Sequence, residues 1–244
     1  MRDRLCSIVT VCFNSEKTIE KTIESVLNQT YKKIEYLIID GSSTDSTMEI
    51  VKKYEPLFEG RMKWISEPDK GIYDAMNKGI RMASGELIGI INSDDFYEPT
   101  AVENMISAMS DKPYQILYGA IRTLKDGVER DISISSHLFL REGMIGHPAC
   151  FVTKRLYNEL GVYDTEFVSA ADYDFMLRMA ENPKVHFQPV YKIIANFATG
   201  GMCASSIAYH DLLKVQEKYN IISPQEYKKQ IFKSKVYDFW HGKK

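Results

Sequence analysis

The 244-residue sequence lacks a membrane-spanning segment, since none of its apolar runs approaches the ~20 residues that a bilayer requires. A signal-peptide apolar region is also missing near Met1, so we expect a cytoplasmic protein. Cysteine is scarce, and no C-x-x-C pair or zinc spacing is formed by Cys6, Cys12, Cys150 and Cys203. We therefore expect buried, reduced thiols rather than disulfides or a zinc site.

The two common phosphate-binding glycine loops are absent as well. No G-x-G-x-x-G follows the first apolar run, which disfavours a dinucleotide-binding fold, and no G-x-x-x-x-G-K-[ST] is present, which excludes a P-loop ATPase. The formal net charge of −2 gives no general attraction to nucleic acid. The hydrophobic content of 44% is ordinary for a soluble globular protein, and the length allows one sizeable α/β domain or two small ones.

The first hundred residues alternate between β-branched runs and amphipathic segments. We expect strands at 5–11, 34–39, 62–65 and 87–91, with a helix in each interval between them. This alternation predicts an α/β fold, a mostly parallel sheet with helices on both faces. In such sheets, ligands bind beyond the carboxyl ends of the strands, where Asn14, Asp40, Asp69 and Asp94 fall.

The second half is less regular. Asp126-Gly127 lies between two strand-like runs and predicts a hairpin. We expect a short strand at 149–152, a helix opening at 169–172 and a strand at 185–197 with a break at Pro189. Two C-terminal helices are expected at 206–219 and 224–240.

The strongest local signal for chemistry is Asn92-Ser93-Asp94-Asp95, at the end of the fourth expected strand. Adjacent carboxylates repel one another, and oxygen ligands at a strand end suit Mg²⁺ or Mn²⁺ better than zinc. The alternative is an ordinary turn before Pro99, which the local residues also favour. Without a glycine loop, a metal held by Asp94 would offer another way to bind a nucleotide diphosphate.

Six blocks in consistent order resemble a family 2 glycosyltransferase with the GT-A fold. They are IVTVCFNSEKTIEKTIESVLNQTY, LIIDGSSTDST, SEPDKGIYDAMNKGI, SGELIGIINSDD, GHPACFV and ADYDFMLRM, and together they cover about residues 5–200. The resemblance implies a GT-A domain at 1–204 and a C-terminal helical extension at 205–244. Within the domain, 5–98 would bind the nucleotide sugar and 99–204 would form the acceptor half. Gly200-Gly201 falls where the family carries a loop that closes over the donor; an ordinary glycine turn is the alternative.

The resemblance also implies a donor-binding set, in which Asp40 accepts the base N–H and Asp94 ligates Mg²⁺ or Mn²⁺. Asn92 and Ser93 complete the family's Asp-any-Asp site, where Asn92 departs from the usual first Asp. The remaining nucleotide contacts are the base pocket, formed by Thr10, Val11 and Asn14, and the ribose and diphosphate neighbours Asp69, Lys70 and Gly71.

Asp172 aligns with the family's catalytic base, which would take the proton from the acceptor hydroxyl. The alternative is that Ser169-x-x-Asp172 is a capping box at a helix start. Asp174 is a competing base, and Ala171 stands where the family usually has an acidic residue. The resemblance places Asp95 and His147 near the donor or acceptor sugar, whereas a lone His beside Pro can equally be a satisfied loop residue.

The function implied is an inverting, metal-dependent transfer of a sugar to a saccharide hydroxyl. The donor would be a UDP-linked sugar, of hexosyl or N-acetylhexosaminyl type, and the acceptor a lipid-linked saccharide in bacterial surface polysaccharide biosynthesis. One alternative is a sugar nucleotidyltransferase, although residues 12–15 lack its glycine-rich, basic loop. Another is a non-catalytic sugar-nucleotide-binding protein, which only the departures at Asn92 and Ala171 support.

The C-terminal stretch Tyr227–Lys244 is rich in lysine. Between the lysines, a single helical face is expected to carry Phe232, Val236, Phe239 and Trp240. Such a basic amphipathic helix is typical of peripheral contact with an anionic membrane. The alternative is a terminal helix that packs on the domain and leaves its lysines in water.

Overall fold

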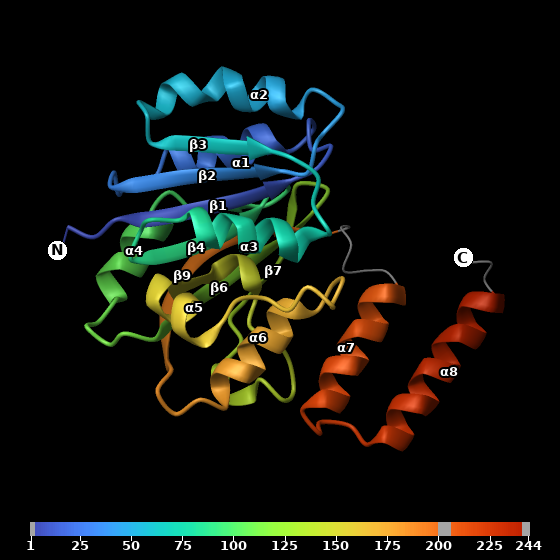
Figure 1. Cartoon of the computed structure of the whole chain (residues 1–244). Helices are drawn as coiled ribbons and strands as arrows, with labels where there is room; N and C mark the ends of the chain where they lie inside the picture. The colour runs from blue at the N-terminus through green and yellow to red at the C-terminus, as the bar shows by residue number, and fades with distance from the viewer. Residues whose placement is uncertain (1–2, 200–205, 241–244) are drawn as a thin grey trace.

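A computed structural model describes residues 3–199 and 206–240, and within them it confirms the expected α/β class (Figure 1). One 9-stranded mixed sheet runs in the order β3-β2-β1-β4-β8-β6-β9-β5, and β7 pairs with β6 outside this path. Gly200 and Gly201, the expected loop, lie outside the described residues. No helix in the described part of the chain is long and apolar enough to cross a membrane.

The first four strands are parallel, as the sequence predicts. They are β1 (Cys6–Cys12), β2 (Ile34–Asp40), β3 (Met62–Ser66) and β4 (Leu87–Asn92). The helices that connect them are α1 (Ile19–Leu27), α2 (Thr47–Tyr54), extended by the 3-10 turn η1 (Glu55–Phe58), and α3 (Ile72–Met82). Alternate residues of β1 enter two separate cores. Val9 and Val11 pack in the core that contains α3, and Ile8 packs in the core that contains α1. Covering both faces explains why the strands are apolar throughout.

The second half extends the same sheet rather than forming its own. The short strand β8 (Cys150–Thr153) pairs antiparallel with β4, so hydrogen bonds join the two predicted halves. The other strands are β5 (Phe96–Tyr97), β6 (Gln115–Lys125), β7 (Val128–Ser133) and β9 (His186–Ala198). The helices are α4 (Ala101–Ala108), α5 (Lys154–Leu160) and α6 (Ala171–Ala180), with 3-10 turns η2 (His137–Phe139) and η3 (His147–Ala149).

Two local predictions in this half are confirmed. Asp126 and Gly127 both have positive φ, 53° and 76°, as the two-residue turn of the β6–β7 hairpin requires. The break expected at Pro189 appears just after it as a register shift: Pro189 still pairs with Tyr118, and β6 then pairs through Gly119 with Val190 and through Ala120 with Ile193. The two-residue strand β5 was not expected, since it is too short to give a periodic signal.

Helices α7 (Ser206–Lys218) and α8 (Pro224–Trp240) form a hairpin at the end of the described chain. Figure 1 shows α7 beside α6 and α8 on the far side of α7 from the sheet. Lys218 binds the buried carboxylate of Asp174 at 2.5 Å, and Tyr219 donates a hydrogen bond to the same oxygen at 3.2 Å. These contacts fasten α7 to α6.

Helix α3 lies unusually close to the sheet. A Cβ added at Gly79 would come within 2.3 Å of Val9 Cγ1, so only glycine allows this approach. The close packing sets the position of the whole helix, including Tyr73 in its first turn.

A buried carboxylate ties together the amino-terminal edge of the parallel strands. Glu35 on β2 accepts hydrogen bonds from Ser7 Oγ at 2.6 Å and from the Ser84 amide at 2.8 Å, and it pairs with Lys63 at 3.1 Å. Burial acts to raise its pKa, but the hydrogen bonds from Ser7 and Ser84 outweigh burial and lower the pKa. The ionised form of Glu35 therefore stabilises the fold.

We expect Glu35→Gln to lower the free energy of unfolding by about 1–3 kcal/mol at pH 7, because buried donors lose a charged acceptor. Since the folded pKa is lowered, the wild-type contribution is present above the ordinary value of 4.5 and is lost as the pH falls further. Urea unfolding at pH 7 and pH 4 should therefore show a gap between the two proteins that narrows in acid. The exposed Glu166→Gln is the control, and a gap independent of pH would contradict this assignment.

Candidate functional site

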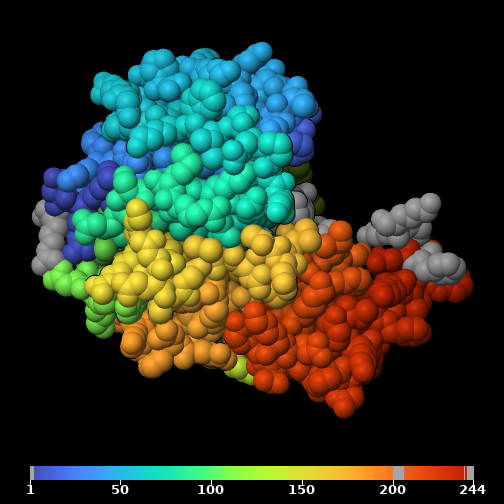
Figure 2. Space-filling view, viewed as in Figure 1, coloured from blue at the N-terminus to red at the C-terminus, as the bar shows by residue number. Residues whose placement is uncertain are grey.

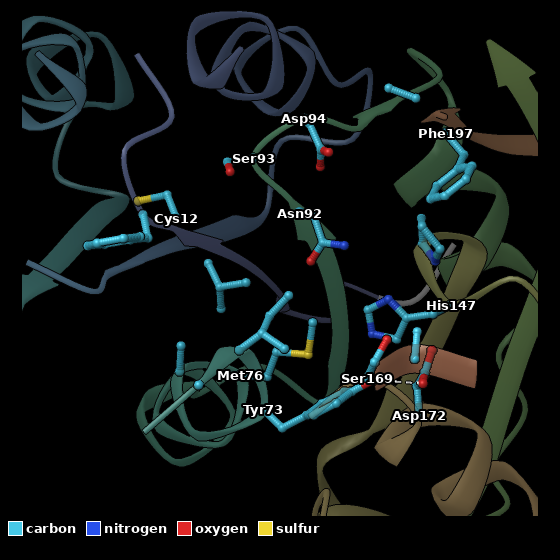
Figure 3. Close-up of a pocket in the computed structure, with 18 of the residues that line it drawn as sticks. Cys12, Tyr73, Met76, Asn92, Ser93, Asp94, His147, Ser169, Asp172 and Phe197 are labelled. Carbon is cyan, nitrogen blue, oxygen red and sulfur yellow. Dashed lines mark hydrogen bonds between the residues drawn. The ribbon is translucent and has the colours of Figure 1, made fainter. Parts of the chain in front are cut away.

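A cavity of about 1470 Å³ opens where the parallel strands end, and it receives residues from both halves of the chain (Figure 3). The predicted site residues that line it are Val11, Asn14, Asp69, Gly71, Asn92, Ser93, Asp94, His147 and Asp172. Four other predicted residues are not among the lining: Thr10, Asp40, Lys70 and Asp95. The two carboxylates central to the sequence prediction, Asp94 and Asp172, thus face one shared space.

Asp94 projects from the turn that follows β4. The turn is closed by a hydrogen bond from the Asp95 amide to the Asn92 carbonyl at 3.2 Å, so the turn interpretation is correct but does not exclude a ligand role. Ser93 Oγ lies 2.7 Å from Ser15 Oγ and links this turn to the loop after β1. The Asp94 side chain is exposed toward the cavity, and its partial desolvation raises its pKa.

The oxygen atoms at this turn fit a hard divalent cation. In the described part of the chain, no other residue forms a hydrogen bond or ion pair with the Asp94 carboxylate, and the buried Asn92 Oδ1 has no partner. No group of three or more His, Cys, Asp or Glu in residues 3–199 and 206–240 could hold a metal by itself. A cation at Asp94 would need further oxygen ligands from a phosphate and water, as Mg²⁺ commonly does.

Asp95 lies on the other side of the turn. It is almost fully buried, and it accepts a hydrogen bond from the Ala198 amide at 3.0 Å. Burial and the neighbouring Asp94 raise its pKa to about 8. Asp95 therefore links β4 to the end of β9, and direct contact of its side chain with a sugar stays a prediction that this geometry does not favour.

The side chains of Thr10 and Asp40 likewise accept hydrogen bonds from other residues of the chain. Tyr36 donates to Thr10 Oγ1 at 3.0 Å, and Asp40, which has no exposed surface, accepts from the Ser43 amide at 3.0 Å and from Ser66 Oγ at 2.6 Å. The Asp40 carboxylate thus shapes the loop after β2. Its predicted contact with a base would require some of these bonds to be exchanged.

The loop after β1 forms one wall of the cavity. Asn14 has a positive φ of 49°, and its Oδ1 accepts a hydrogen bond from the Thr44 amide at 2.9 Å. The neighbouring Phe13 lines the cavity with 63% of its surface exposed. The sequence analysis did not single out Phe13, although an aromatic residue in a loop at a strand end is a signal for a binding surface.

Asp69 and Lys70 belong to the loop before α3, and they differ in their surroundings. Asp69 lines the cavity and is held by Lys78 at 2.5 Å. The Lys70 amide donates to Asp74 at 3.1 Å, and Lys70 is not part of the lining. The loop therefore offers Asp69 and Gly71 to the cavity rather than the Lys70 side chain.

Asp172 lies in the first turn of α6 and lines the cavity. Tyr73 Oη donates a hydrogen bond to Asp172 Oδ1 at 2.9 Å, which joins α3 to α6 across the cavity wall (Figure 3). The capping-box alternative is wrong, because the N-cap is Ala170 and no side chain caps this helix. Asp174, the competing base, is buried and bound to Lys218, so it points away from the cavity.

His147 lines the cavity from the start of η3. Burial lowers its pKa, although the nearby Asp172 acts in the opposite direction, so the ring is neutral near pH 7. Its edge packs against Tyr163, with the ring centroids 6.1 Å apart. A neutral imidazole beside Asp172 can donate or accept a hydrogen bond.

Comparison with known proteins gives a family match. The model of glycosyl transferase family 2 matches residues 7–170. An uncharacterized glycosyltransferase of Mycobacterium tuberculosis is 38% identical over 181 residues, which cover 71% of this chain and 68% of that protein. Chondroitin synthase of Escherichia coli is 31% identical over 186 residues, which cover 72% of this chain but only 26% of the synthase.

Solved structures share the fold at low identity. Staphylococcus aureus TarS 1–349 in complex with UDP-GlcNAc has a TM-score of 0.73 and 17% identity, covering 96% of this chain and 72% of that one. The mannosyltransferase PcManGT of Pyrobaculum calidifontis, in complex with GDP-Man and Mn²⁺, has a TM-score of 0.69 and 16% identity, covering 97% and 70%. The chain spans 39% of the longer TarS structure.

The family match extends over most of the chain and includes residues 7–12 of β1, all of β4 and the cavity residues from Val11 to Ala170. The chain therefore belongs to glycosyl transferase family 2 and is a glycosyltransferase with the GT-A fold.

Proposed function

We propose that this enzyme is an inverting, metal-dependent glycosyltransferase that moves a sugar from a UDP-linked donor to a hydroxyl of a saccharide acceptor. The observation that carries the proposal is the shared cavity, which Asp94 enters from the end of β4 and Asp172 enters from the start of α6. One carboxylate is available to a cation on the diphosphate, and the other to the hydroxyl that attacks.

The donor side supports a nucleotide diphosphate sugar. Phe13 presents an exposed ring on which a base can stack, and Asn14, Asp69 and Gly71 line the same cavity. When bound at Asp94, Mg²⁺ or Mn²⁺ would neutralise the diphosphate as it leaves. TarS with UDP-GlcNAc supports uracil and a hexosyl or N-acetylhexosaminyl group, whereas PcManGT was solved with GDP-Man.

The acceptor side supports general base catalysis by Asp172. The acceptor hydroxyl must lose a proton as its oxygen attacks the anomeric carbon opposite the leaving diphosphate, and Asp172 can take that proton. An α-linked donor would then give a β-linkage. Tyr73 holds Oδ1 of Asp172, which leaves the second oxygen free to face the acceptor.

The setting we propose is bacterial surface polysaccharide biosynthesis at the cytoplasmic face of the membrane. The acceptor there would be a lipid-linked saccharide, and the basic C-terminal helix would make a peripheral contact with the bilayer. The relatives named for PGL/p-HBAD biosynthesis, 25% identical over 210 residues, are compatible with a glycolipid product.

Asp172→Asn is expected to lower kcat by about 10²–10⁴-fold, because the amide cannot accept the hydroxyl proton. UDP binding should be unchanged, since Asp172 lies on the acceptor side. UDP release from a panel of UDP-sugars is the measurement, and exposed Asp131→Asn is the control. Full activity of Asp172→Asn would refute the assignment. No turnover by wild type with any donor would support a non-catalytic binding protein, and pyrophosphate release from UTP would support a nucleotidyltransferase.

Asp94→Ala is expected to abolish the part of UDP binding that depends on Mn²⁺. Calorimetric titration with UDP, with Mn²⁺ and again after chelation, should give two affinities for wild type and one for the variant. A thermal-shift screen with UDP, GDP and dTDP under both conditions identifies the base. Equal Mn²⁺ dependence in wild type and Asp94→Ala would place the cation elsewhere.

Tyr73→Phe tests whether the bond between α3 and α6 positions the base. Loss of one hydrogen bond to a carboxylate, worth about 1.5 kcal/mol, should reduce kcat by about tenfold. The KM for the donor should stay the same, because the Tyr73 hydroxyl contacts Asp172. A rise in the donor KM with kcat unchanged would instead assign Tyr73 to donor binding.

A further inference from the structure

Helix α8 presents two different faces, and α7 covers one of them. Along that inner face, Gln230, Ser234 and Asp238 make polar contacts with α7. Their partners are Tyr209 Oη at 3.1 Å, His210 Nε2 at 3.0 Å and Ser206 Oγ at 2.8 Å, in that order. Three contacts spaced along the helix fix its rotation about its own axis.

The outer face of α8 exposes an apolar stripe. Phe232, Val236 and Trp240 recur every four residues and expose 69%, 39% and 78% of their surfaces. Figure 2 shows α8, in red, at the outer edge of the molecule. A row of large, solvent-exposed apolar side chains indicates a surface that binds another molecule or a membrane.

Lysines surround this stripe. Lys228, Lys229, Lys233 and Lys235 are all exposed, and within Pro224–Trp240 they face only two acidic residues. Glu226 pairs with Lys229 at 3.3 Å, and Asp238 is turned toward Ser206 on α7. Four lysines against the single paired Glu226 leave the outer face with an excess of positive charge.

The positive charge of the outer face indicates which kind of partner it can bind. A second copy that docked through the same face would bring lysine against lysine, which opposes association. Aromatic rings interleaved with lysines instead match the boundary of an anionic bilayer, where rings enter the headgroup layer and ammonium groups meet lipid phosphates.

We propose that the outer face of α8 docks on an anionic lipid surface through Phe232, Val236 and Trp240. This docking deepens the proposed function. The docking itself is independent of catalysis, and only the link between docking and the lipid-linked acceptor rests on the proposed function. Ala208, Tyr209 and Leu212 of α7 line the cavity, while the same helix holds α8. Docking would therefore bring the acceptor side of the cavity close to the bilayer that carries a lipid-linked saccharide.

The chain offers a matched pair of variants. Phe232→Ser with Lys233→Glu removes an aromatic residue and reverses a charge on the proposed surface. Tyr191→Ser with Lys192→Glu makes the same change on β9, where Tyr191 is 81% exposed. Co-sedimentation of the full chain with phosphatidylglycerol-containing vesicles, and with phosphatidylcholine vesicles alone, is the measurement.

We expect wild type and the β9 variant to bind the anionic vesicles in a salt-sensitive way, and the α8 variant to lose at least fivefold in bound fraction. In a Trp64→Phe background, Trp240 emission should shift to the blue on binding. UDP affinity in solution should be the same in all variants, which separates this test from that of the proposed function. Equal binding by both variants, no preference for anionic lipid, or a dimer in solution that only the α8 variant loses would overturn the proposal.

Discussion

The hydrogen bond from Tyr73 to Asp172 joins α3 to α6 across the cavity, and in the proposed mechanism it positions the base. Tyr73 belongs to α3, which the glycine at position 79 holds close against β1. Asp172 belongs to α6, in the half of the chain that follows β4. Because β8 continues the sheet from β4, the strands keep both halves in one rigid frame. A nucleotide sugar bound at Asp94 would therefore meet a base whose position is set by the core rather than by a loop.

The acidic turn after β4 separates two adjacent carboxylates into different roles. Asp94 faces the cavity, whereas Asp95 turns inward to the end of β9 and is held with a raised pKa by burial. One side chain is thus available to a cation, and its neighbour anchors the wall. The same division occurs on α6, where Asp172 faces the cavity and Asp174 fastens the helix to Lys218.

The parallel half was predictable from the sequence because an unbroken apolar run indicates a strand buried on both faces. Strands β1 and β2 are buried along their whole length. The family resemblance also predicted that Asp94 and Asp172 share one site, and both residues line the same cavity. Contacts between distant residues left no local pattern, so the sequence could not show that Ser66 donates a hydrogen bond to Asp40, or that Tyr73 holds Asp172. The capping-box interpretation failed for a different reason. Helix α6 starts after Ala170, so Ser169 precedes the N-cap residue by one position.

In the proposed mechanism, a divalent cation at Asp94 would hold the donor with its anomeric carbon toward Asp172. Crystals grown with Mn²⁺ and a non-hydrolysable UDP-sugar test it most directly, by anomalous scattering at the manganese edge. The account predicts a manganese peak bonded to an Asp94 oxygen and to the diphosphate, with the sugar on the side of Asp172. A manganese peak remote from Asp94, or a sugar directed away from Asp172, would contradict it.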